Sequence, residues 1–165
     1  MQERGRELDG GDHRQAVGRQ VLWSATLGPV PLAERIEAAE VNGYPVLSIS
    51  PLDYERARAE GVDPGELLKQ ARDRGVELSV LDGAIEWYPH DPPKRSIGSS
   101  TFTVDEVIRA GEAFEITSLN ALAPFPTHLP IDGLAERYAA LCDQAAERGV
   151  RVHFEFTPRS PVSDI

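Results

Sequence analysis

Hydrophobic and polar residues alternate strictly along residues 150–156, which read Val-Arg-Val-His-Phe-Glu-Phe. Such alternation is typical of a β-strand with one apolar face, and Thr157-Pro158 marks its end. The polar face carries Arg151, His153 and Glu155. Two interpretations stay open on spacing alone: a barrel strand whose polar face looks inward, and a half-buried strand whose polar face lies in water.

The rest of the chain divides into alternating strands and helices. Apolar residues at helical spacing, bounded by capping residues and glycines, predict four helices, and short apolar runs predict the strands between them. The earlier strands are expected at 21–27, 45–50, 76–81 and 115–122, and the helices from about 32, 64, 103 and 134, with a further helical turn near 54–59. Five strands alternating with four helices predict an α/β protein with a parallel sheet.

The connection from a predicted helix to the following strand has nearly the same sequence at two places in the chain. Gln70-Ala-x-Asp-Arg-Gly-Val76 recurs as Gln144-Ala-x-Glu-Arg-Gly-Val150. We expect Gly75 and Gly149 to end their helices in the left-handed backbone conformation that glycine adopts readily. Two explanations of the repeat stay open: an ancestral duplication, or convergent use of the same residues in a helix-to-strand turn.

Polar residues on the predicted strands distinguish a barrel from an open sheet. Open parallel sheets are covered by helices on both faces, so their strands tend to be apolar throughout. Here four strands have one polar face, formed by Ser24 and Thr26, Ser48 and Ser50, Ser118 and Asn120, and His153 and Glu155. A complete eightfold barrel takes about 250 residues, so we predict an incomplete (β/α) barrel, similar to a TIM barrel, with about five parallel strands.

Composition and net charge limit the kinds of molecule that this chain is expected to bind. The chain has 165 residues, of which 41% are hydrophobic, and a formal net charge of −10. We expect a leader at 1–19 and one domain at 20–165. The negative charge argues against nucleic acid, and no apolar run suits a membrane span. One cysteine and no secretory signal predict a cytoplasmic location.

Three stretches resemble the xylose isomerase-like TIM barrels, the superfamily of sugar phosphate isomerases and epimerases that also contains endonuclease IV. They are Leu22-Trp-Ser-Ala-Thr-Leu with the helix and strand that follow it, Val80-Leu-Asp-Gly-Ala-Ile-Glu-Trp-Tyr-Pro89, and Val152-His-Phe-Glu-Phe-Thr-Pro158. The resemblance covers about 20–165. It implies a metal-dependent isomerase or epimerase acting on a sugar or sugar phosphate. The family's other metal ligands come from strands six to eight, beyond the five predicted here.

The resemblance makes Glu155 the expected ligand of a divalent metal ion (Mg²⁺, Mn²⁺ or Zn²⁺), held weakly by this chain, and the expected catalytic residue. Carboxylate oxygens suit such hard cations. The expected substrate-binding residues are Asp82, Trp87, Asn120, His153 and Arg159. Each also has a structural interpretation: a turn aspartate, a packed tryptophan, polar groups that satisfy the barrel, and an exposed arginine.

Two further functions stay open. An inactive barrel fragment would act only through association, because the two edge strands of a five-stranded sheet are unpaired and promote pairing with another chain. Phosphodiester hydrolysis, as in endonuclease IV, is disfavoured by the net charge of −10 and by four scattered histidines.

Overall fold

The computed structural model describes residues 19–84, 86–87, 102–123 and 131–156. Five strands form one parallel sheet, as predicted, and their order is β1-β2-β3-β4-β5. The strands are β1 (Val21–Leu22), β2 (Val46–Ile49), β3 (Glu77–Ala84), β4 (Ser118–Leu122) and β5 (Arg151–Glu155). Of the expected leader, Arg19 alone is described, and it pairs with Glu77 at 2.6 Å.

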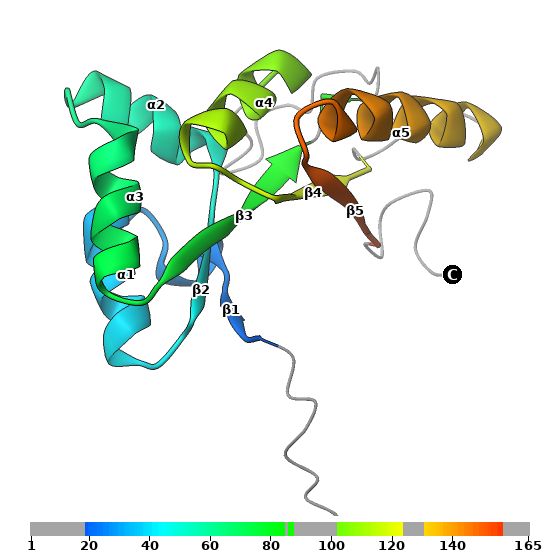
Figure 1. Cartoon of the computed structure of the whole chain (residues 1–165). Coiled ribbons are helices and arrows are strands. Elements are labelled where there is room, and N and C mark those ends of the chain that lie inside the picture. Colours follow the sequence, from blue (N-terminus) through cyan, green and yellow to red (C-terminus); the bar gives the residue numbers. More distant parts are fainter. Residues whose placement is uncertain (1–18, 85, 88–101, 124–130, 157–165) are drawn as a thin grey trace, which may run out of the picture.

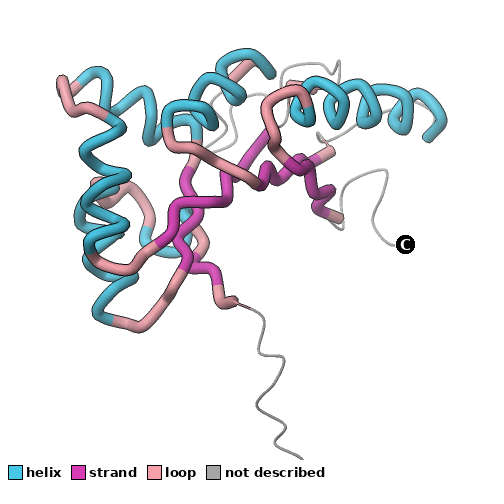
Figure 2. Tube along the Cα trace, in the orientation of Figure 1, coloured by secondary structure: helices cyan, strands magenta, loops and turns pink. Residues whose placement is uncertain are grey.

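The helices lie along one side of the sheet, and among the described residues no helix covers its other face (Figures 1 and 2). They are α1 (Leu32–Val41), α2 (Pro51–Ala59), α3 (Pro64–Asp73), α4 (Val104–Ala113) and α5 (Ile131–Ala146). The sequence predicted four helices, and the helical turn expected near 54–59 proves to be the complete helix α2. None of the described helices combines the length and apolar character that crossing a membrane requires.

The hydrophobic core lies between the helices and the covered face of the sheet. Ile36, Leu47, Leu81, Phe114 and Leu119 are all at most 2% exposed. In β4 the residues that face the helices, Leu119 and Ala121, are buried, whereas their neighbours on the other face are only half-buried. The polar face is therefore the helix-free face of the sheet.

Helix ends follow the chemistry read from the sequence. The Glu106 N–H donates to Thr103 Oγ1, and the Thr103 N–H donates to the Glu106 carboxylate at 2.8 Å, which is a capping box. Gly75 and Gly149 have φ of 70° and 71°. The next residue in each case bonds back into the helix, Val76 N–H to the Ala71 carbonyl and Val150 N–H to the Ala145 carbonyl.

The first predicted strand is mostly wrong. Only Val21–Leu22 pairs with β2, and Ser24–Leu27 forms a 3₁₀ helix, η1. Ser24 and Thr26 are therefore not on a strand face. The apolar residues of this stretch are compatible with either a strand or a short helix, because the stretch is too short for its periodicity to distinguish the two.

The turn between α4 and β4 also differs from its prediction. Glu115 was expected to open the strand, but it has φ of 51° and is the only described residue other than glycine with a positive φ. Ile116 N–H bonds to the Gly111 carbonyl at 2.9 Å, the same bond that follows Gly75 and Gly149. Glu115 thus occupies a position that favours glycine.

We expect Glu115→Gly to raise the free energy of unfolding by about 0.5–1 kcal/mol, because a side chain in this conformation costs about 1–2 kcal/mol, partly offset by the entropy of an added glycine. Urea unfolding measures the change. Arg72→Ala is the control, since Glu115 also pairs with Arg72 at 2.5 Å. A Glu115→Gly protein less stable than Arg72→Ala would contradict the expectation.

Candidate functional site

Three polar side chains form a row across neighbouring strands on the helix-free face. Asp82 comes from β3, Asn120 from β4 and Glu155 from β5. Leu81 pairs with Leu119, one residue before Asp82 and Asn120, and Glu155 pairs with Leu122, two residues beyond Asn120 on the same face. The carboxyl ends of parallel strands meet at one edge, which is where barrels build their active sites.

Asn120 links the two carboxylates. Its Nδ2 donates to Glu155 Oε2 at 2.5 Å, and the same amide also lowers the pKa of Asp82 by hydrogen bonding. One amide nitrogen carries two N–H groups, so it suits a position between two acceptors. Asn120 therefore holds two negative groups near each other without their direct contact.

Asp82 is held from the other side by two serines. Ser24 Oγ donates to Asp82 Oδ2 at 3.2 Å, and Ser48 Oγ donates to the same oxygen. Burial raises the pKa of Asp82, the charge of Glu155 raises it further, and the hydrogen bonds from Ser48, Ser24 and Asn120 oppose the rise. This carboxyl thus keeps its proton to a higher pH than an exposed aspartate, and it can donate a hydrogen bond to a sugar oxygen when protonated.

Of the other predicted site residues, His153 lies beside the row on the same face, whereas Trp87 is packed among aromatic side chains. His153 pairs in register with Asn120 and is exposed. Trp87 is 6% exposed, its Nε1 donates to the Leu122 carbonyl at 2.8 Å, and its ring meets Tyr138 of α5. The structure thus places Trp87 in packing, as its structural interpretation held, rather than in an open wall for a sugar. Arg159 lies outside the described residues.

The donors on this face are too few for a metal site by themselves. Among the described residues, no three His, Cys, Asp or Glu side chains are grouped so as to hold a metal ion. A catalytic zinc ion takes three protein ligands, whereas the row provides the carboxylates of Asp82 and Glu155 and the amide of Asn120. Glu155 remains a candidate ligand within an incomplete set.

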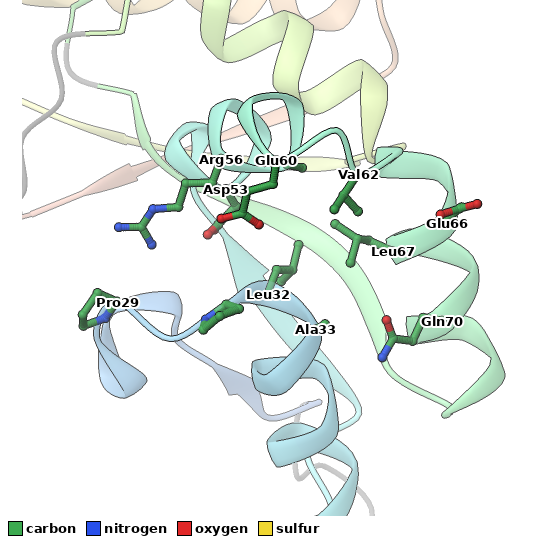
Figure 3. Close-up of a pocket in the computed structure, with 12 residues that line it drawn as sticks. Pro29, Leu32, Ala33, Asp53, Arg56, Glu60, Val62, Glu66, Leu67 and Gln70 are labelled. Atoms are coloured by element: carbon green, nitrogen blue, oxygen red, sulfur yellow. The ribbon is translucent and has the colours of Figure 1, made fainter.

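A separate pocket of about 340 Å³ lies on the helix side, among α1, α2 and α3 (Figure 3). Leu32, Ala33, Val62 and Leu67 give it apolar walls, and Asp53 of α2 reaches it. Because the polar row lies on the other face of the sheet, this pocket is not part of that row.

Sequence reasoning placed Ser24 and Ser48 on polar strand faces without assigning them to the site, and it missed a buried ion pair. Arg35 of α1 and Asp53 of α2 form this pair, with side chains 3% and 5% exposed. A signal for Arg35 was present, because it lies next to Ile36 within the apolar stripe of its helix. Its partner Asp53 also had a signal, because Ser50-Pro-Leu-Asp53 has the spacing of a capping box, but that signal concerns the start of α2 and not Arg35.

Fold and polar row together define the class: an α/β protein with one side of a parallel barrel, helices outside and hydrogen-bonding groups at the strand ends of the inner face. No protein-family model matches the sequence. No curated protein matches it either.

Solved structures do match the fold. The IOLI protein, in a structure described as having a bound zinc atom, gives a TM-score of 0.65 at 16% identity over 86% of this chain and 53% of its own. A xylose isomerase domain containing protein from Salmonella typhimurium LT2 gives 0.63 at 10% identity, covering 84% of this chain and 49% of its own. A xylose isomerase-like TIM barrel/4-hydroxyphenylpyruvate dioxygenase fusion protein gives a TM-score of 0.63 at 12% identity, and the match covers 82% of this chain and 21% of the fusion protein.

The chain therefore has the fold of the xylose isomerase-like TIM barrels, as its sequence motifs suggested. It spans about half the length of two of these proteins, and about a fifth of the fusion protein. At identities of 10–16% the likeness concerns the fold alone.

Proposed function

We propose that this chain supplies one side of the active site of a metal-dependent isomerase or epimerase that acts on a sugar or sugar phosphate. The row Asp82–Asn120–Glu155 is the observation that carries the proposal. It places two carboxylates and an amide at the strand ends of the inner face, where a polyhydroxylated substrate finds both donors and acceptors.

Each residue of the row has a separate role in this proposal. Asp82 and Asn120 bind hydroxyl groups of the sugar, and Asn120 keeps the Glu155 carboxylate oriented through its 2.5 Å hydrogen bond. Glu155 is one ligand of a divalent metal ion. When bound, such an ion polarises carbonyl and hydroxyl oxygens of a substrate. In this proposal the row supplies only part of the ligand set of the metal ion.

We expect Mn²⁺ to bind this chain weakly and Glu155→Gln to weaken that binding by about tenfold or more, because loss of even an outer partner of a metal ligand costs 10–100-fold in affinity. Isothermal titration with Mn²⁺ measures the change. Glu147→Gln, which removes an exposed carboxylate just before β5, is the matched control and should bind like the wild type. Equal binding by all three proteins would remove Glu155 from the metal site.

A second candidate function is association through the edges of the sheet. Among the described strands, β1 and β5 each pair on one side only. Large apolar side chains are exposed near both edges, with Trp23 55% and Phe156 41% exposed. In this proposal, a second copy of the chain covers these edges.

A further inference from the structure

Burying the ion pair between Arg35 and Asp53 costs desolvation free energy that the attraction between the two charges does not clearly offset. Arg35 Nη2 donates to Asp53 Oδ1, and both side chains are almost completely buried. Arg35 Nε is buried with no hydrogen-bond partner. Desolvation makes a buried pair a poor source of stability, and an unpaired N–H adds to the cost. The pair therefore calls for a reason besides stability.

Its remaining hydrogen bonds lead to the two segments that carry Ser24 and Ser48. Asp53 Oδ2 accepts from the Ser50 N–H at 2.8 Å and from Ser50 Oγ at 3.1 Å, and Ser50 directly follows β2. Arg35 Nη1 donates to the Ser24 carbonyl at 3.5 Å. The pair thus ties the start of η1 to the end of β2 from the helix side of the sheet.

The backbone of Ser24 controls a proton on the other side. Its N–H donates to Ser48 Oγ at 2.8 Å. Ser48 Oγ accepts this N–H through one of its two lone pairs and donates its single proton to Asp82 Oδ2. The position of the Ser24 backbone therefore sets both hydroxyl contacts to Asp82.

We propose that Arg35 and Asp53 are positioning residues that hold Ser24 and Ser48 in place beside Asp82. Neither residue touches Asp82 or the space in front of it; both act through the Ser24 backbone and the Ser50 turn. The inference rests on the proposed function only for the importance of Asp82, because the coupling itself is a property of the folded chain.

The test is the pKa of the Asp82 carboxyl, followed by ¹³C NMR across a pH titration, with Asp82→Asn used to assign the resonance. Ser24→Ala removes one hydrogen bond to the carboxylate and should raise the proton affinity of Asp82 roughly threefold to tenfold. Arg35→Lys keeps a cation for Asp53 but lacks the planar fork that also reaches the Ser24 carbonyl, so it should raise the affinity in the same direction.

The double variant distinguishes positioning from a general effect. If Arg35 acts through Ser24, then Arg35→Lys and Ser24→Ala both remove the same Ser24 hydroxyl contact, so the double variant should shift the pKa by less than the sum of the two single changes. Arg148→Lys, which alters an exposed cation paired with Glu112, should leave Asp82 unchanged. Additive shifts would overturn the proposal.

A third variant guards against loss of folding. Arg35→Met with Asp53→Leu replaces both charges by apolar side chains of similar volume, a change that buried pairs often tolerate. It should raise the proton affinity of Asp82 as Ser24→Ala does. A folded variant that titrates like the wild type overturns the proposal, whereas failed Mn²⁺ binding would affect only the proposed function.

Discussion

Replacing Asp53 with alanine should lower the free energy of unfolding by about 3–5 kcal/mol, because it leaves the Arg35 guanidinium buried without its counter-charge. The side chain of Arg35 is 3% exposed, so water cannot replace the lost carboxylate. The substitution also removes the acceptor of the Ser50 N–H at the start of α2. Urea unfolding followed by circular dichroism measures the change.

The exposed ion pair between Arg148 and Glu112 is the control for this prediction. These side chains are 39% and 57% exposed and lie 2.8 Å apart. Because water and salt screen such a pair, Glu112→Ala should cost at most about 1 kcal/mol. Similar losses in Asp53→Ala and Glu112→Ala would mean that burial does not set the value of the ion pair.

Light scattering at physiological salt should show a weight-average mass at least twice the 18.1 kDa of one chain, rising with protein concentration. The outer edges of β1 and β5, which no other described strand pairs, offer backbone donors and acceptors to another strand. Trp23 and Phe156 add exposed apolar surface near those edges, and burying it on association is favourable.

Lysine at an edge strand opposes such pairing. We expect Val21→Lys combined with Trp23→Lys to shift the mass toward that of one chain. Val41→Lys is the matched control, because Val41 is 76% exposed but lies on α1 and not on an edge strand. A concentration-independent mass of 18.1 kDa for the wild type would remove the association proposal.

Local chemistry in the sequence was sufficient for the order of the elements. Gly75 and Gly149 end helices because their φ near 70° is costly for other residues, and that cost is local. Thr103 and Glu106 form the capping box that their spacing predicts. These features depend on residues within one turn of each other, so they can be read without knowledge of the fold.

The errors fall where local signals are weak or are overridden. Val21–Leu27 was predicted as one strand, yet it turns into η1 after two residues. Glu115 adopts a glycine-like conformation, because the chain must turn there to bring β4 beside β3. In both places the packing of the sheet determines the backbone conformation, and the local sequence does not.

The sequence by itself determined the alternation of strands and helices, the polar side of β4 and β5 and the candidacy of Asp82, Asn120 and Glu155, because these follow from local periodicity and recognisable motifs. Only the tertiary structure decided which of these groups meet. Strand register brought Asn120 between the two carboxylates, and the packing of α1 against α2 joined Arg35 to Asp53. Such contacts depend on the relative positions of segments far apart in the chain, which no local pattern encodes.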